Sequence, residues 1–245
     1  MEKNVFNEII WVEQTVTYIE TDGTTRVYAA IGNEDSIEVF MPEAEKIDVQ
    51  YATESIMDLR YRDVTLGVIS ENGVLYVPED AKLLVRDYHY KLSVKNDDLH
   101  VILDWNTVDG ASMLKGDLVL MVHHALPEEL TGAQKRTIGG RLAVSVTLQV
   151  DGEYITQLGG HADIFVKTDD ENIKVYYVDN DGKATLIESN YLNGDTHTSV
   201  NHFSIYMYTD EEVSEDFPII IVIAIIAVVL ALIVIFLLWR RKQKD

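Results

Sequence analysis

Residues 141–152 read RLAVSVTLQVDG, and this stretch decides the fold class. Apolar side chains occupy every second position from Leu142 to Val150, with smaller or polar residues between them. Because successive side chains of a β-strand point to opposite faces, this alternation is typical of a strand with one buried face. Asp151-Gly152 follows directly and is a preferred sequence for a tight hairpin turn. The stretch therefore predicts an antiparallel hairpin.

Alternation of the same kind recurs elsewhere in the chain. DLHVILDW (98–105) places Leu99, Val101, Leu103 and Trp105 on one face. HFSIYMY (202–208) reads as a final core strand, in which we expect Phe203 and Ile205 to be buried and Tyr206 to lie on the opposite face. Asp-Gly or Asn-Gly pairs separate such runs at 22–23, 72–73, 109–110, 151–152, 181–182 and 193–194. This pattern predicts an all-β fold, an antiparallel β-sandwich-like domain.

Three Pro-Glu pairs follow apolar runs, at 42–43, 78–79 and 127–128. Proline is favoured at the first position of a helix, and acidic residues stabilise a helix N-terminus. We therefore predict a brief helical turn after each pair, placed between two strands.

The segment from Phe217 to Trp239 contains no charged or amide side chain. As a helix it would be about 34 Å long, enough to cross a hydrocarbon core of ~30 Å. Acidic residues precede it, and Arg240, Arg241 and Lys242 follow it. Because Lys and Arg next to a span stay on the cytoplasmic side, we predict a single transmembrane helix with the preceding region outside the cell.

These features divide the chain into five parts. The first boundary is placed near residues 50–63, where the alternation lapses. We predict an N-terminal β segment that belongs to this or a further module (1–60), a β-sandwich surface module (61–208), an acidic linker (209–216), a transmembrane helix (217–239) and a basic cytoplasmic tail (240–245).

An exterior location requires export, but the first twenty residues lack the apolar run of a signal peptide. We therefore expect the chain to be the C-terminal part of a longer protein, or its true start to lie upstream of Met1. The alternative is a tail-anchored protein with a cytoplasmic bulk, which would reverse the charge rule.

Composition excludes several classes of function. The chain has 41 acidic and 20 basic residues and a net charge of −21, which disfavours binding to nucleic acid or to an anionic surface. It has no cysteine, so disulfides, thiolate metal sites and cysteine nucleophiles are all excluded.

Residues 141–208 carry a V-x-Y…D-x-D-G hairpin followed by an HFS-x-Y strand. In this respect the chain resembles the C-terminal β module of membrane-anchored bacterial and archaeal cell-surface proteins. The resemblance covers about residues 74–208 and implies a structural or display unit, not a catalyst. The matching residues are Val175, Tyr177, Asp179 or Asn180, Asp181, Gly182, His202, Phe203, Ser204 and Tyr206.

The same hairpin has part of the spacing of a calcium-binding loop. Asp179, Asp181 and Glu188 would be ligands in that interpretation, but Tyr177 occupies the first ligand position. Strands flank the loop, so we interpret it as an Asp-Gly hairpin turn and keep calcium as the alternative.

Other candidate sites are incomplete. His123 and His124 point to opposite faces of a strand, so they cannot bind one metal ion together. His161 and Asp163 share a face but lack a third ligand for zinc. No G-x-S-x-G motif is present, and we assign no catalytic residue and no cofactor.

We expect a single-pass, membrane-anchored cell-surface protein whose module serves as an adhesive display unit or a stalk, without a catalytic role. The expected partners are the lipid bilayer and other surface proteins or glycans, and not nucleic acid. Two alternatives are a subunit of a larger membrane assembly and an anchored extracellular hydrolase with its catalytic part upstream.

Overall fold

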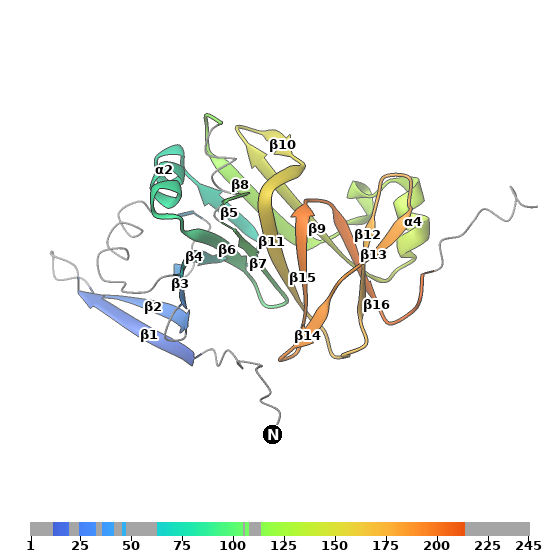
Figure 1. The fold of residues 1–245 in the computed structure, drawn as a ribbon, viewed down its shortest axis with the longest axis horizontal. Helices are drawn as coiled ribbons and strands as arrows, with labels where there is room; N and C mark the ends of the chain where they lie inside the picture. Colours follow the sequence, from blue (N-terminus) through green and yellow to red (C-terminus); the bar gives the residue numbers. More distant parts are fainter. Residues whose placement is uncertain are drawn as a thin grey trace, which may run out of the picture. The chain divides into compact units, whose positions relative to one another are not determined.

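The computed structural model describes residues 12–19, 25–32, 36–41, 46–47, 63–104, 106–107 and 114–213. Two β-sheets contain most of these residues, so the predicted all-β class is confirmed. Figure 1 shows their strands. The larger sheet, sheet A, has nine strands in the order β1-β2-β3-β4-β6-β7-β11-β15-β14. Their bounds are β1 Val12–Ile19, β2 Thr25–Gly32, β3 Ser36–Met41, β4 Asp63–Ile69, β6 Lys91–Lys95, β7 Leu99–Leu103, β11 Gln157–Lys167, β15 Asp195–His202 and β14 Asn190–Leu192.

The smaller sheet, sheet B, has the strand order β13-β12-β16-β9-β8-β5, with the short strand β10 paired to β9. The bounds are β13 Ala184–Ile187, β12 Lys174–Val178, β16 Ile205–Thr209, β9 Leu142–Val150, β8 Leu118–His124, β5 Val74–Val77 and β10 Glu153–Ile155.

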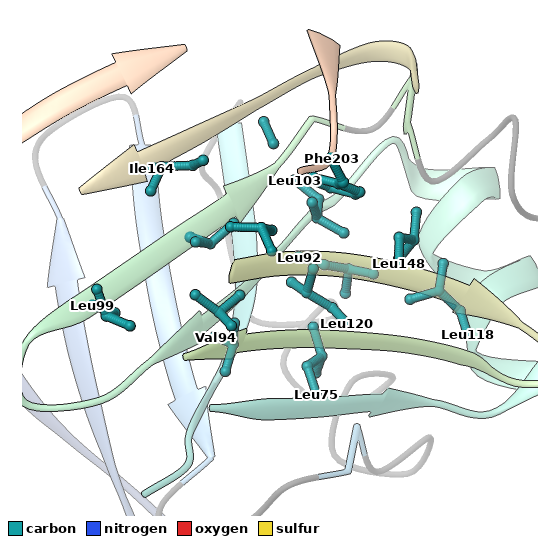
Figure 2. Packing of buried hydrophobic residues seen from close by; sticks show 14 of the residues in the cluster. Leu75, Leu92, Val94, Leu99, Leu103, Leu118, Leu120, Leu148, Ile164 and Phe203 are labelled. Carbon is teal, nitrogen blue, oxygen red and sulfur yellow. The ribbon is translucent and has the colours of Figure 1, made fainter. Parts of the chain in front are cut away.

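One hydrophobic cluster receives side chains from both sheets, as expected for a sandwich. Figure 2 shows Leu92 and Leu103 of sheet A in the same cluster as Leu120 and Leu148 of sheet B. Each of these four side chains is at most 1% exposed. Full burial of one such side chain stabilises the fold by about 1.5–3 kcal/mol, so this cluster is the main source of stability.

The predicted strand 142–150 is β9. Most of its alternating apolar residues are buried as predicted, but Ala143 and Ser145 of the opposite face are buried too. Val144, Val146, Leu148 and Val150 all belong to the core cluster. Leu142, at the first position of the strand, is the exception and is 37% exposed. Leu99, Val101 and Leu103 of β7 also enter the core, whereas Trp105, the fourth residue predicted on that face, lies outside the described residues.

Sheet A is not purely antiparallel, which corrects the sequence-based expectation. Strand β3 pairs with β4 in parallel, and β4 pairs with β6 in parallel. Parallel neighbours require a long crossover connection. The connection from β4 to β6 passes through β5 and the helix α2 (Glu79–Tyr88), and it is this detour to sheet B that allows the parallel pair.

Four of the predicted Asp-Gly or Asn-Gly turns are confirmed, at 72–73, 151–152, 181–182 and 193–194. Each glycine has a positive φ, between 65° and 98°. Asp151 and Asn193 also have positive φ, as two-residue hairpin turns of this type require. The pairs at 22–23 and 109–110 lie outside the described residues.

Helical segments follow two of the three proline positions. Pro78 precedes α2, which is a ten-residue helix and therefore longer than the brief turn we expected. Pro127 begins the 3₁₀ segment η1 (Pro127–Glu129), and α4 (Gly132–Ile138) comes next. The α4 side chain of Gln134 donates to the Val178 carbonyl at 3.2 Å, which attaches the helix to β12. The segment after Pro42 lies outside the described residues.

The chain separates into two compact units, residues 1–211 and 212–245, and both sheets belong to the first. The predicted anchor, including Phe217, Trp239, Arg240, Arg241 and Lys242, lies outside the described residues. Among the residues that are described, no helix has the length and apolar character needed to cross a membrane. The predicted boundary near 50–63 also falls almost wholly outside them.

Candidate functional site

The outer face of sheet A, opposite the core, carries a row of aromatic rings. His100 of β7 is registered with Phe165 of β11, which is registered with His197 of β15. The ring centroids are 5.5 Å apart for His100 and Phe165 and 4.5 Å apart for Phe165 and His197, and both pairs are stacked. Phe40 of β3 extends the row, with its centroid 6.0 Å from that of His100. We call these four residues the ring row.

Stacking across strands determines which part of each ring is accessible. Cross-strand neighbours on one face lie about 4.5–5.5 Å apart, which matches the thickness needed for stacked rings. Since the faces of Phe165 contact His100 and His197, it is the ring edge that points away from the sheet. The edge of an aromatic ring is its electropositive part, so this surface is suited to contact with oxygen atoms.

A buried carboxylate lies at one end of the ring row. Glu38 is 3% exposed, and its Oε1 accepts a hydrogen bond from the Ser93 hydroxyl and pairs with His100 Nε2 at 2.9 Å. A buried carboxylate needs such donors, because an unpaired one is costly. Glu38 therefore joins β3 to β7 across two intervening strands.

Small residues make this crossing possible. A Cβ atom at Gly67 of β4 would lie 2.3 Å from Ser93 Oγ and 2.9 Å from the Phe40 ring. The missing side chain leaves the space that the Phe40 ring and the Ser93 hydroxyl occupy. Lys95 lies above the same ring, with Nζ 5.5 Å from its centroid, which is within cation–π distance.

A second carboxylate pairs with the other end of the row. Asp163 Oδ1 lies 3.0 Å from His197 Nε2. Burial raises the pKa of Asp163, but the hydrogen bond and charge of His197 and a hydrogen bond from Ser199 outweigh it, so the pKa is lowered overall. Both Ser199 and His197 thus bond to the carboxylate. A nucleophilic triad needs the histidine between the serine and the acid, so these three residues do not have that arrangement.

His161 and Asp163, which share a face of β11, bind different partners. His161 Nδ1 lies 3.6 Å from Asp104 Oδ2, whereas Asp163 binds His197. Asp104 also accepts a hydrogen bond from the Asn106 amide at 3.1 Å. No group of three or more metal-binding side chains occurs among the described residues. The structure therefore shows two separate His–Asp pairs here.

A groove runs beside the ring row. Its volume is about 250 Å³. We call it the sheet A groove, and it is lined by Glu38, Lys95, His100, Ile102, Phe165, Leu192, Asn193 and Asp195. The last three residues come from β14, the turn after it and β15, so they form one wall. Glu38 and Lys95 of β3 and β6 line it as well, so the groove combines polar and charged side chains with three apolar ones, as a ligand site requires.

A second groove of about 310 Å³ lies between α4 and the beginning of β9. Its main cation, Arg141, already donates to the carbonyls of Thr137 and Ile138 and pairs with Glu211. Since Arg141 is bonded within the protein, we regard the sheet A groove as the better candidate.

The predicted Asp-Gly hairpin turn is confirmed at residues 179–182. Asp179 Oδ1 accepts the backbone N–H groups of Asp181 at 3.0 Å and Lys183 at 2.8 Å, which closes the turn between β12 and β13. This oxygen therefore has a structural role. Glu188, the third calcium candidate, is exposed, and its carbonyl accepts from the Thr198 hydroxyl.

The two halves of the surface-module motif lie next to each other. Tyr177 of β12 is registered with Tyr206 of β16, and the His202 ring packs edge-on against Tyr177 with centroids 4.6 Å apart. Asp181 and Gly182 form the turn that leads away from β12, and Phe203 and Ser204 lie between β15 and β16.

The expected orientation of HFSIYMY is wrong. The stretch is not one strand: β15 ends at His202 and β16 begins at Ile205, so the chain passes from sheet A to sheet B between them. Tyr206 is fully buried and belongs to the core cluster, whereas Ile205 is only half-buried. Phe203 is buried as predicted. The turn between sheets changes the alternation, which a single-strand interpretation cannot anticipate.

Hydrogen-bond partners for His202 were expected and are found only in part. Its Nδ1 lies 3.1 Å from Asn201 Oδ1, but its buried Nε2 has no hydrogen-bond partner in the described structure. Burial lowers the pKa of His202, which keeps the ring neutral. The ring thus acts mainly as an aromatic packing group beside Tyr177.

Sequence reasoning identified His161 and Asp163 but missed Glu38, His100, Phe165 and His197. The alternation of side chains along each strand would show that each of these four residues faces away from the core. Only the strand register shows that they lie in one row. No model of a protein family matches the chain, and no curated protein matches it.

Proposed function

We propose that the chain is a single-pass, membrane-anchored cell-surface protein whose β-sandwich is a structural and adhesive module outside the cell. The observation that carries this proposal is the apolar segment 217–239 with acidic residues before it and basic residues after it. This charge distribution favours an exterior location for everything that precedes the segment.

The fold is consistent with a mechanical role. One core cluster joins the two sheets, so the module is held together without disulfides. The proposed resemblance to surface β modules points the same way, since the motif residues Tyr177, His202 and Tyr206 pack together at the junction of the two sheets.

The outer-face contacts support a structural role for the module. His100 and His197 are each paired to a carboxylate and stacked on Phe165. These contacts connect β3, β7, β11 and β15 of sheet A, which is a structural role.

Membrane topology tests the proposal, and the absence of native cysteine makes single-cysteine labelling clean. Glu171→Cys places a thiol on an exposed turn, and Gln243→Cys places one in the basic tail. In intact cells that produce the full reading frame, a membrane-impermeant maleimide should label the first variant. The second should be labelled only after the membrane is opened.

The reverse labelling pattern would place the sandwich in the cytoplasm and would overturn the proposal. If both variants were labelled only after lysis, the sandwich and the tail would both be inaccessible from outside the cell. This result would also contradict the proposal. The unsubstituted chain is the control, because it has no thiol to react.

A further inference from the structure

We propose that the sheet A groove binds a neutral saccharide. This inference rests on the proposed adhesive function, because it supplies the ligand class for that adhesion. In the groove, hydrogen-bond donors and acceptors lie beside apolar side chains, and this chemistry restricts the class of ligand that can bind.

The polar groups of the groove fall into two sets. Glu38 and His100 are bonded to each other, so their hydrogen-bonding capacity is largely used within the protein. Asn193 and Asp195 are different: in the described part of the chain, neither side chain has a hydrogen bond or an ion pair. Lys95 has the Phe40 ring as its neighbour. Three polar groups are therefore available to a ligand.

The charges of these groups favour a neutral ligand. Lys95 can only donate hydrogen bonds, Asp195 as a carboxylate only accepts them, and the Asn193 amide does both. Glu38 also lines the groove, but its Oε1 is bonded to Ser93 and His100. Of the charges without such partners, Lys95 would repel a cation and Asp195 would repel an anion. Hydroxyl groups both donate and accept, so a neutral molecule with several hydroxyls satisfies all three.

The apolar lining favours a ligand that also has C–H surface. Ile102 and Leu192 line the same groove, and Leu192 is 51% exposed, whereas the Phe165 edge beside them is suited to a hydroxyl oxygen. A pyranose ring has hydroxyls around its rim and C–H groups on its faces. Its C–H groups would bury exposed apolar surface while its hydroxyls reach Asn193 and Asp195, which is the usual division of roles in a ligand pocket.

The position of the groove suits recognition of a chain end or of an exposed sugar unit. Its Asn193 wall is the turn between β14 and β15, at the edge of sheet A. Asn193 has a φ of 54°, a left-handed conformation that the turn needs. The pairing of β14 with β15 fixes the backbone on both sides of this turn, which reduces the entropic cost of binding.

The test uses the purified full chain in detergent micelles and an array of neutral saccharides containing glucose, galactose, mannose and N-acetylglucosamine units. We expect at least one saccharide to bind. Asp195→Ala should weaken binding of that saccharide at least tenfold, because the carboxylate acceptor is lost. Asn193→Gly should weaken it severalfold while keeping the turn, since glycine readily adopts positive φ.

Two matched controls show whether a loss is local. Asp151→Gly makes a comparable change at a left-handed turn residue in the β9–β10 hairpin of sheet B, and Glu153→Ala removes an exposed carboxylate there. Both should bind the saccharide within about twofold of the parent chain, and circular dichroism should show that all four variants are folded.

Failure to bind any saccharide on the array would overturn the inference, as would unchanged binding by folded Asn193→Gly and Asp195→Ala chains. Competition by free amino acids, whose opposite charges also match Lys95 and Asp195, would overturn it in favour of a zwitterionic ligand. None of these results depends on topology. A failure here is therefore distinguishable from a failure of the labelling test for surface location.

Discussion

Gly67 of β4 has no side chain, and this lets Phe40 and Glu38 of β3 extend across β4 toward the middle of sheet A. The space is filled by the Phe40 ring and the Ser93 hydroxyl, and Ser93 in turn donates to Glu38. A single glycine therefore supports a buried carboxylate and an aromatic contact. Such dependence of a polar network on one small residue can be tested directly.

Gly67→Ala should destabilise the fold by about 1–3 kcal/mol, the usual cost of overpacking a filled site. The added Cβ would lie 2.3 Å from Ser93 Oγ, so the Ser93–Glu38 contact must shift. Urea unfolding of the purified chain measures the change. Gly132→Ala is the matched control: its Cβ would meet only Arg136 Nη1 at 3.9 Å, so no loss is expected there. Equal losses at both sites would contradict the argument.

The burial of His202 predicts that the free energy of unfolding depends on pH. Burial lowers its pKa below the usual value of 6.5, so the unfolded chain binds a proton more readily than the folded chain. Stability should therefore fall as the pH drops through 6.5 toward the lowered folded pKa. The measurement is the midpoint of urea unfolding at several pH values between about 5 and 8, the range in which histidines titrate.

His202→Phe isolates this contribution, because phenylalanine keeps an aromatic ring next to Tyr177 but does not titrate. We expect the variant to lose less stability than the parent chain on acidification. Identical pH profiles for the two chains would show that His202 does not carry the effect.

At the scale of elements, the corner between β15 and β16 holds the sandwich together where the chain changes sheets. The buried Tyr206 hydroxyl donates to the His202 carbonyl four residues earlier. This resembles the tyrosine corner of Greek-key β-proteins, in which a tyrosine hydroxyl fixes a connection between strands. Burial also raises the pKa of Tyr206, so the hydroxyl stays a donor at neutral pH.

Tyr206→Phe should destabilise the fold by about 1–3 kcal/mol, because the His202 carbonyl would lose its donor in a buried environment. Thermal and urea unfolding measure the change. Tyr154→Phe removes a hydroxyl from a side chain that is 66% exposed, and it should change stability by less than about 0.5 kcal/mol. A similar effect of the two substitutions would exclude a corner role for the Tyr206 hydroxyl.

At the scale of the whole molecule, a strongly acidic sequence is combined with one apolar core shared by two sheets. Acidic residues keep a protein soluble but repel one another. Several of them are paired locally, with Glu38 and Asp163 bound to histidines and Glu211 bound to Arg141.

The sequence by itself determined the all-β class, the strands 142–150 and 99–103, and four hairpin turns, because alternation and positive φ are local properties of neighbouring residues. It also identified His161 and Asp163 as sharing a face. The sequence did not reveal the parallel pairing of β3 with β4, the burial of Tyr206 or the ring row. Those features depend on which strands become neighbours and in what register. Glu38 and His100 are 62 residues apart, and only the tertiary fold brings them within 2.9 Å.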